Sequence, residues 1–280
     1  MKVINLIGKR NKRETEKEGV DGHVNERERE KEEEKSEAKS DVADLQGVEK
    51  RERRQRSDKG KVLITPRDEA VLRWIGEQYA VRLDQLQVLL GRQAQARTEV
   101  EGVVSADTAR RVVSRWAKAG WAVRRKVYHR EPEWVWLTRT GMQLAGLEYQ
   151  ALEPSLALLK HTYEVNRVRL RFEARYGVDA VWRSERAIKP IRQRDRDVHY
   201  ADAEVEIDGK KIGLEIERTP KKPIVLRSIL AGLVREYRWV WYLVTPKALS
   251  GVQRAVQDLP PDKRKIVRVY DLETISEIKP

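Results

Sequence analysis

The chain has 280 residues and a formal net charge of +13. This length predicts two globular units and a tail rather than one domain, and the basicity favours an anionic polymer or membrane surface as partner. A membrane is disfavoured, because no apolar run is long enough to span a bilayer and the apolar start at residues 3–7 is too short for a signal peptide. The absence of cysteine excludes disulfides and thiolate metal sites, which fits a cytoplasmic location.

Residues 1–60 form a segment of mixed charge, with 17 Lys or Arg, 16 Asp or Glu and no aromatic residue. Such a segment cannot bury enough apolar surface to offset the entropy of ordering it, so we expect a disordered charged tail. Its charges nearly cancel. The basicity of the protein therefore belongs to residues 61–280, which carry a net charge of +12.

Residues 61–150 begin with two predicted helices. The first starts at Thr65, with Pro66 at the first helical position and acids in the first turn, and runs to about Tyr79. The second is short, carries leucines between Leu83 and Leu90, and is expected to stop at Gly91. The polar stretch 92–104 predicts a loop.

A third helix is expected over residues 105–119, with Ser105 or Asp107 as its cap and Gly120 at its end. Its apolar residues recur at helical spacing on one face. Over residues 105–130 there are eight Lys or Arg against one acid, whereas a solvated amphipathic helix normally mixes its charges. This pattern favours a helix that binds DNA over an ordinary solvated face.

Strands over residues 122–128 and 134–137, joined by a turn at Glu131-Pro132, and a short helix over residues 141–147 complete this part. Three helices, a hairpin and a closing helix predict a winged helix-turn-helix, in which the third helix enters the major groove and the wing follows the phosphates. The candidate DNA-binding residues are Thr108, Arg110, Arg111, Ser114, Arg115, Lys118, Arg124, Arg125, Lys126 and Arg130. Four tryptophans, Trp116, Trp121, Trp134 and Trp136, are expected to fill the small core rather than to stack on bases.

Residues 151–280 predict an α/β domain. A helix is expected over residues 156–176, followed by strands near 181–188, 200–207 and 211–218, a helix over 224–236, a strand over 239–244, a helix near 249–258 and a strand over 266–270. The nearly continuous apolar run 239–244 is typical of a central strand buried on both faces. The passage 211–244 implies a parallel strand pair with a right-handed crossover.

The chemistry of this domain, if any, lies in the hairpin that turns at Asp208-Gly209. A two-residue turn places Asp202 opposite Glu215, with Glu217 on the same face, and a four-residue turn would place Asp202 opposite Glu217 instead. Opposed carboxylates repel unless a cation lies between them or one is protonated. Asp202, Glu215 and Glu217 are therefore candidate catalytic residues, and Asp202 and Glu215 candidate ligands of Mg²⁺ or Mn²⁺. The alternative is a wet sheet face on which Arg or Lys from elsewhere neutralises the acids.

Taken together, a winged helix, the spacing of His161 and Asn166, the sequence Trp182-Arg-Ser-Glu185, the pair Ala201-Asp202 and the sequence Glu215-Ile-Glu217 resemble the replication-relaxation family, over about residues 62–245. Members of that family are encoded on plasmids and conjugative elements. The resemblance implies double-stranded DNA as partner, with a relaxase or other transfer or replication proteins, and a homodimer remains open.

The second half also resembles the restriction-endonuclease-like fold, in which Pro-Asp and Glu-x-Lys motifs on adjacent strands hold the metal. The resemblance places Asp202 and Glu215 at the acidic positions and Glu217 at the lysine position, where it is a departure that puts cleavage in doubt. Lys189, Lys211 or Lys221 could replace the missing lysine. His161 is expected to be a hydrogen-bonded core residue.

The sequence thus predicts an α+β protein with residues 1–60 as a tail, 61–150 as a winged helix-turn-helix and 151–280 as an α/β domain with a restriction-endonuclease-like αβββαβ core. The leading interpretation is a sequence-specific double-stranded DNA-binding protein of a plasmid or conjugative element. A metal-dependent nuclease guided by the winged helix and a transcriptional regulator are the alternatives.

Overall fold

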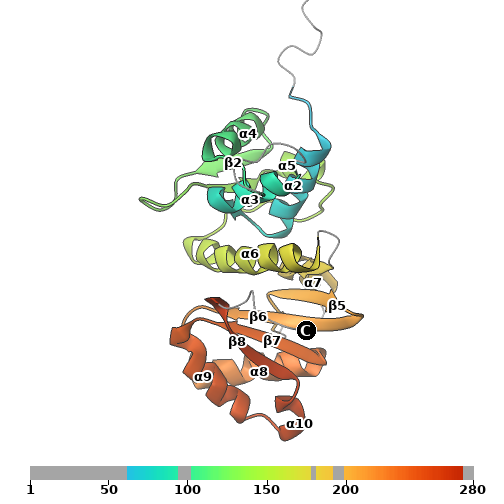
Figure 1. Ribbon diagram of the computed structural model, residues 1–280, viewed down its shortest axis with the longest axis vertical. Helices are drawn as coiled ribbons and strands as arrows, with labels where there is room; N and C mark the ends of the chain where they lie inside the picture. Colours follow the sequence, from blue (N-terminus) through green and yellow to red (C-terminus); the bar gives the residue numbers. More distant parts are fainter. Residues whose placement is uncertain (1–61, 94–101, 178–180, 192–198, 274–280) are drawn as a thin grey trace, which may run out of the picture. The chain divides into compact units, whose positions relative to one another are not determined.

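The computed structural model describes residues 62–93, 102–177, 181–191 and 199–273, all within one contact unit that covers residues 60–280 (Figure 1). The protein is of the α+β class, with a three-stranded and a five-stranded sheet among the described residues. The expected tail, residues 1–60, and most of the expected loop at 92–104 lie outside the described residues. No helix of the described part is long and apolar enough to cross a membrane.

The described residues of the first half, 62–93 and 102–150, form four helices and three strands. In chain order these are α2 (Pro66–Glu77), β1 (Val81–Arg82), α3 (Leu83–Gln93), α4 (Ala106–Lys118), β2 (Ala122–Arg125), β3 (Trp134–Leu137) and α5 (Arg139–Leu144). The sheet order is β1-β3-β2, and both strand pairs are antiparallel. Strand β1 was not predicted, because two residues are too few to show an alternating pattern.

Side-chain caps fix where the helices of this half begin. Thr65 and Asp68 form a reciprocal capping box at the start of α2. The hydroxyl of Ser105 accepts from the amide of Thr108 at the start of α4, and that of Thr138 accepts from the amide of Gly141 in α5. The expected caps at Thr65 and Ser105 are confirmed, and Gly120 has the positive φ of 75° expected of a residue that ends a helix.

Gly91 does not end its helix, and the prediction that it does was wrong. The residue lies inside α3 without a positive φ. Glycine is needed at this position because the backbone of Gly102 approaches it closely. A Cβ at residue 91 would lie 2.3 Å from the carbonyl oxygen of Gly102. The expected strand over residues 122–128 ends earlier, at Arg125, and the expected helix 141–147 begins earlier, at Arg139.

The core of the first half is built as predicted around its large aromatic side chains. Trp116, Trp121, Trp134 and Trp136 are all buried. Trp116 and Trp121 pack with the apolar residues of α2, α3 and α4, whereas Trp134 and Trp136 pack in a second cluster with Ala80 and Leu159. A domain of this size needs such large side chains to bury sufficient apolar area.

The second half begins with the long helix α6 (Leu156–Tyr176), whose bounds agree with the prediction. It continues with β4 (Trp182–Ser184), α7 (Glu185–Ile191), β5 (Ala203–Ile207), β6 (Lys210–Glu217), α8 (Pro223–Glu236), β7 (Trp239–Val244), α9 (Pro246–Gln257), α10 (Pro261–Arg264) and β8 (Val267–Asp271). The strand order is β4-β5-β6-β7-β8, with the first two pairs antiparallel and the last two parallel. The predicted parallel pair, β6 and β7, is therefore confirmed.

Two predictions of local structure in this half were incomplete. The strand expected over residues 181–188 ends at Ser184 and gives way to α7, and the short helix α10 was not expected. The hairpin β5–β6 has the two-residue turn, since Ile207 pairs with Lys210 and Ala203 with Leu214. Asp208 and Gly209 both have the positive φ that such a turn requires.

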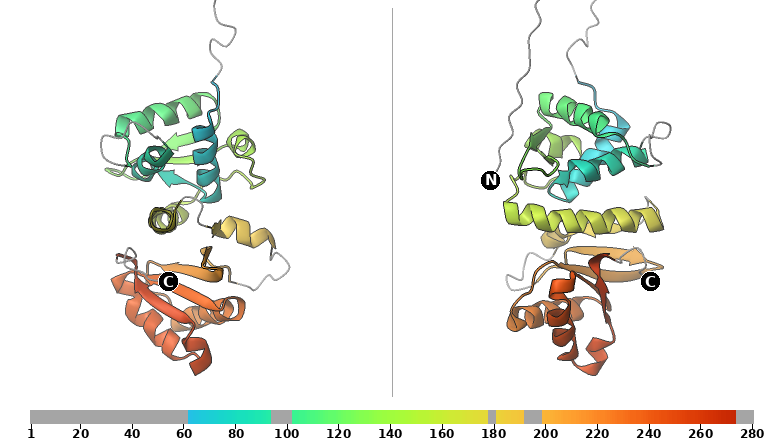
Figure 2. Two further views of the ribbon diagram at one scale, coloured as in Figure 1. Left: turned by 45° about the vertical axis from the view of Figure 1, so that its right-hand side comes forward. Right: turned by 60° about the vertical axis from the view of Figure 1, so that its left-hand side comes forward.

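Helices cover both faces of the five-stranded sheet (Figure 2). Helix α6 packs through Val165, Val168 and Phe172 on one face, against the apolar side of the β5–β6 hairpin. Helices α8 and α9 pack on the other, which also contains Val240 and Tyr242 of β7. Strand β7 is thus covered on both sides, as its continuous apolar sequence predicts.

Helix α6 also contacts the first half. The side-chain amide of Asn166 donates to the carbonyl of Ala80 at 2.9 Å and to the side chain of Gln85 at 3.2 Å. Leu159 packs with Trp134 and Trp136. Helix α6, which covers one face of the five-stranded sheet, therefore also packs against residues in and next to the three-stranded sheet.

Candidate functional site

Helix α4 presents its cations on the face opposite the core. Arg110, Arg111 and Lys118 are exposed, while Thr108 and Ser114 are half-buried. An open groove runs along this face, lined by Asp107, Val62 and the predicted residues Arg110, Arg111, Ser114, Arg115 and Lys118. The only acid of the predicted segment, Asp107, pairs with Arg110 at 2.7 Å. Arg111 and Lys118 make no ion pair with the described residues, so their charges are available to an anion.

Arg115 is held by the protein itself. Its guanidinium pairs with Asp68 of α2, whose side chain is 0% exposed. The same carboxylate accepts from the indole nitrogen of Trp116 at 3.0 Å and from the hydroxyl and amide of Thr65. Arg115 therefore holds α4 against α2. The sequence analysis predicted only a DNA contact for this residue and not this structural role.

The cations of the β2–β3 hairpin are also engaged with neighbouring groups. Arg124 pairs with Glu133 at 2.6 Å, and Arg125 pairs with Glu153. Lys126 donates to the carbonyl of Glu131. Arg130, at a turn with a φ of 63°, is exposed and makes no ion pair with the described residues. Arg125 and Lys126 are themselves exposed, so a phosphate can still approach them.

The acids of the β5–β6 hairpin lie where the two-residue turn places them, and each has a basic partner. Asp202 accepts from the backbone amide of Ile216 through one oxygen and contacts Nε2 of His161 through the other, both at 2.8 Å. Burial lowers the pKa of His161, but Asp202 outweighs this effect, so the pKa lies above its ordinary value. His161 is hydrogen-bonded as predicted, but with a side chain 33% exposed it is not a core residue.

Glu215 is the most deeply buried of these acids, with 2% of its surface exposed. Its Oε2 lies 2.9 Å from Nε2 of His199, without the alignment of a good hydrogen bond. Burial and the charge of Asp202 raise the pKa of Glu215 to about 7, against the opposing effect of His199. Tyr242 is the register partner of Glu215 on β7, and its buried hydroxyl has no hydrogen-bond partner in the described part of the chain.

The third acid, Glu217, forms an ion pair with Lys221. The structure therefore places Lys221, of the three lysines considered from the sequence, beside the acids. Lys189 pairs with Glu185 and Lys211 with Glu204. We will call Asp202, Glu215 and Glu217 with their partners His161, His199 and Lys221 the acid–base cluster.

The acid–base cluster does not have the arrangement of a preformed metal site. Within the described residues no group of three or more His, Asp or Glu side chains is placed to hold a metal ion. The opposed carboxylates are compensated by the ammonium group of Lys221, by contacts with His161 and His199, whose pKa values the carboxylates raise, and by the raised pKa of Glu215. This agrees with the alternative of acids neutralised from elsewhere, except that the partners are two histidines and a lysine.

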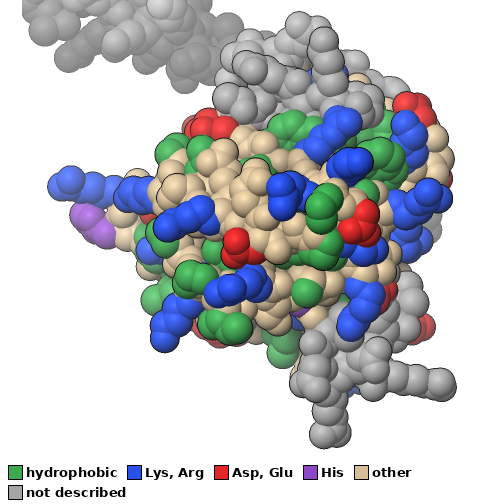
Figure 3. All heavy atoms as spheres, turned by 90° about the horizontal axis from the view of Figure 1, so that it is seen from below, with side chains coloured by type: hydrophobic (Ala, Val, Ile, Leu, Met, Phe, Trp, Pro, Cys, Tyr) green, Lys and Arg blue, Asp and Glu red, His purple; other side chains and the backbone are tan. Residues whose placement is uncertain are grey.

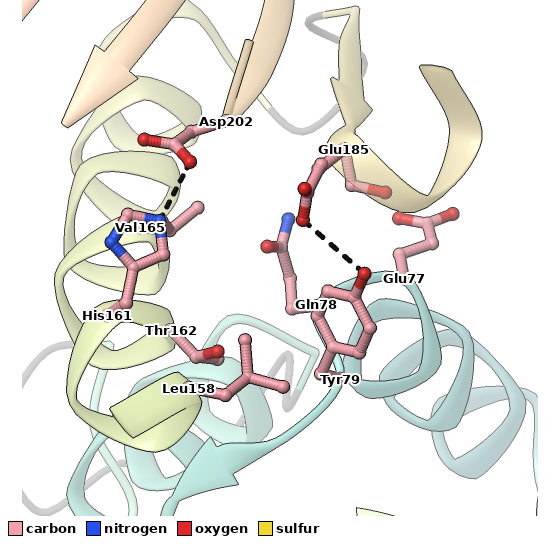
Figure 4. A pocket seen from close by; sticks show the side chains of 10 residues that line it. Glu77, Gln78, Tyr79, Leu158, His161, Thr162, Val165, Glu185 and Asp202 are labelled. Atoms are coloured by element: carbon pink, nitrogen blue, oxygen red, sulfur yellow. Dashed lines mark hydrogen bonds and ion pairs between the residues drawn. The ribbon is translucent and has the colours of Figure 1, made fainter. Parts of the chain in front are cut away.

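His161 and Asp202 of the acid–base cluster line a small pocket, whose other residues come from the end of α2 and the two residues after it, from α6, and from the junction of β4 and α7 (Figure 4). His161 and Asp202 face it from one side. From the other, the hydroxyl of Tyr79 contacts Glu185 at 3.4 Å, and Tyr79 itself has a φ of 69°. A positive φ is uncommon for an aromatic residue. The buried hydroxyl of Ser184 also lines the pocket and has no hydrogen-bond partner in the described structure.

Three residues of these sites were missed from the sequence. Asp68 was interpreted only as an acid in the first turn of a helix, although its spacing from Thr65 is that of a capping box. His199 has no sequence motif around it that predicts a functional role, and the structure places it beside the carboxylate of Glu215. Glu185 was named only as part of a family-like motif and lies in the pocket.

The sequence matches no protein-family model, and no curated protein is significantly similar to it.

Proposed function

We propose that this protein binds double-stranded DNA through a winged helix-turn-helix formed by residues 62–147. The order of elements supports this assignment: a helix and a short strand are followed by two helices and a two-stranded hairpin. Strand β1 pairs with β3 and so adds a third strand to the hairpin. In such a domain the third helix lies in the major groove and the hairpin follows the phosphate backbone. Here these elements are α4 and the β2–β3 hairpin.

The observation that carries the proposal is the exposed face of α4. Arg111 and Lys118 are exposed and make no ion pair with the described residues, and both line the groove along the helix. A helix with its side chains is about 10–12 Å wide, which fits the major groove of about 12 Å. Arg111 is the leading candidate for base recognition, since arginine commonly makes bidentate contacts with guanine.

The biological setting remains a proposal that rests on the family resemblance. In it, the protein belongs to a plasmid or conjugative element and acts in replication or in the relaxosome, with a relaxase among its partners. The five-stranded sheet and its helices would act as a scaffold of restriction-endonuclease-like topology.

The DNA-binding proposal predicts that the double variant Arg111→Ala, Lys118→Ala binds its preferred duplex about tenfold to a hundredfold more weakly than the wild type. The duplex is selected from a random pool with the wild-type protein, and affinity is measured by fluorescence anisotropy. Lys210→Ala, which removes an exposed cation at the β5–β6 turn, is the matched control and should bind normally. Unchanged affinity and salt dependence in the double variant would reject the proposal.

Metal-dependent DNA cleavage is the second candidate function. Strand topology favours it, because an antiparallel β4-β5-β6 meander followed by a parallel β7 is the arrangement of a restriction-endonuclease-like core, with Asp202 and Glu215 on adjacent strands. Two observations argue against DNA cleavage. The acids already contact His199 and Lys221, and Glu217 stands where the motif has a lysine. Asp202, Glu215 and Glu217 would have to exchange these partners for a metal ion.

Supercoiled plasmid incubated with the protein and Mg²⁺ or Mn²⁺ separates the two functions. We expect no nicking and no shift of the melting curve on adding metal, because the acids are already compensated. Asp202→Asn should leave DNA affinity unchanged in either case. Metal-dependent nicking that disappears in Asp202→Asn would instead make this protein a nuclease.

A further inference from the structure

A second set of cations lies on the three helices α8, α9 and α10, far along the sequence from α4. Residues 218–268 contain 12 Lys or Arg and three acids, so this stretch supplies much of the net positive charge of residues 61–280. Figure 3 views the side of the molecule on which these helices lie, and Lys and Arg side chains are spread across it with few acids among them. The exposed cations of α8, α9 and α10, with the residue that follows α10, include Arg227, Arg235, Lys247, Arg254, Lys263 and Lys265. We call this set the α8–α10 surface.

Few of these cations have a close acid partner among the described residues, as is also true of Arg111, Lys118 and Arg130. Lys247, Lys263 and Lys265 make no ion pair with any described residue, and Arg254 contacts only the carbonyl of Ser250. Arg227 reaches Asp258 only at 4.0 Å, and Arg235 reaches Glu236 at 3.6 Å. By contrast, Arg110, Arg115, Arg124 and Arg125 all have a close acid partner.

Helix stability does not account for the whole set. Cations stabilise the C-terminus of a helix and destabilise its N-terminus. Arg235, Arg254 and Lys263 lie in the last turns of α8, α9 and α10, and Lys265 follows α10 directly. Lys247, in contrast, lies in the first turn of α9, which contains no acid. Because the 12 cations of residues 218–268 outnumber the three acids, like charges repel each other here, and an anionic partner would relieve this repulsion.

We propose that the α8–α10 surface is a second DNA-contacting surface, which binds the phosphate backbone of a duplex without reading its sequence. Exposed lysines and arginines suit phosphate oxygens, which occur at regular spacing along a duplex. Single-stranded nucleic acid is a poorer fit, because its binding surfaces combine cations with aromatic side chains on which bases stack. None of the large apolar side chains exposed in the described structure is aromatic.

The double variant Lys247→Gln, Lys263→Gln tests this second surface. Binding of the full chain to a random-sequence 60-base-pair duplex is measured between 50 and 200 mM salt. Losing two phosphate contacts should lower the slope of log affinity against log salt by about 2, so affinity should fall about tenfold less over this range than for the wild type. The matched control, Lys210→Gln, Lys211→Gln at the β5–β6 turn, should keep the wild-type slope.

The same duplex separates this proposal from that for α4. The variant Arg111→Ala, Lys118→Ala should still bind this duplex with an affinity that depends on salt. Combining it with Lys247→Gln and Lys263→Gln should lower the salt slope further. A salt slope for Lys247→Gln, Lys263→Gln equal to those of the wild type and of the control would overturn the second surface, whatever the α4 variant does. Weaker binding to anionic phospholipid vesicles with an unchanged DNA slope would overturn it in favour of a membrane.

Discussion

Replacing Asp68 with Ala should lower the free energy of unfolding by about 3–5 kcal/mol, the loss typical of breaking a buried charge pair. Asp68 is 0% exposed and receives hydrogen bonds from Thr65, Trp116 and Arg115. Without it, α2 loses its capping box, and the indole nitrogen of the fully buried Trp116 loses its acceptor. The contact between α2 and α4 would thus lose the carboxylate that accepts hydrogen bonds from both Arg115 and Trp116.

Chemical denaturation of Asp68→Ala and of Glu69→Ala checks this prediction. Glu69 is the adjacent acid in the first turn of α2 but is exposed, so its removal should cost less than about 1 kcal/mol. A loss of similar size in the two variants would mean that Asp68 contributes only through the helix dipole. Arg115→Ala should also destabilise the protein, in contrast to Arg111→Ala, although both residues were predicted to contact DNA.

Stability should decrease as the pH rises from about 5.5 to 8. Burial and Asp202 raise the pKa of Glu215 from 4.5 to about 7, so in this range the folded state binds more protons than the unfolded state. The stabilisation is complete below the unfolded pKa and is lost as the pH rises through the folded pKa. The pKa values of His161 and His199 are raised as well, because their carboxylate partners outweigh the effect of burial, and their contributions have the same sign.

The expected change is about 2–3 kcal/mol, since each pKa unit corresponds to about 1.4 kcal/mol. Melting curves recorded at pH 5.5, 6.5, 7.5 and 8 should show a falling midpoint in the wild type. Glu215→Gln, which keeps the shape of the protonated side chain, should flatten this dependence. Glu206→Gln, which removes an exposed acid of the same hairpin, should not. Equal pH dependence in all three proteins would show that Glu215 does not titrate in this range.

Most of the secondary structure follows from the amino-acid sequence, because the signals that specify helices, strands and turns are local. Helix α6 and strand β7 have the predicted bounds, since a long periodic helix and a continuous apolar strand are unambiguous patterns. The Asp208-Gly209 turn sets the register of β5 and β6, and so the opposition of Asp202 and Glu215. The burial of the four tryptophans also followed from composition and domain size.

Which charged side chains are paired depends on the tertiary structure. Arg111 and Arg115 look alike in sequence, yet the second is held by Asp68, 47 residues away. Asp202 and Glu215 needed partners that the sequence could not name, and these come from α6 and from His199. The sequence around Gly91 predicts the end of a helix, whereas the structure shows that glycine is required there because the backbone of Gly102 lies against it. Such pairings depend on contacts between segments distant in the chain, and local periodicity and spacing carry no information about them.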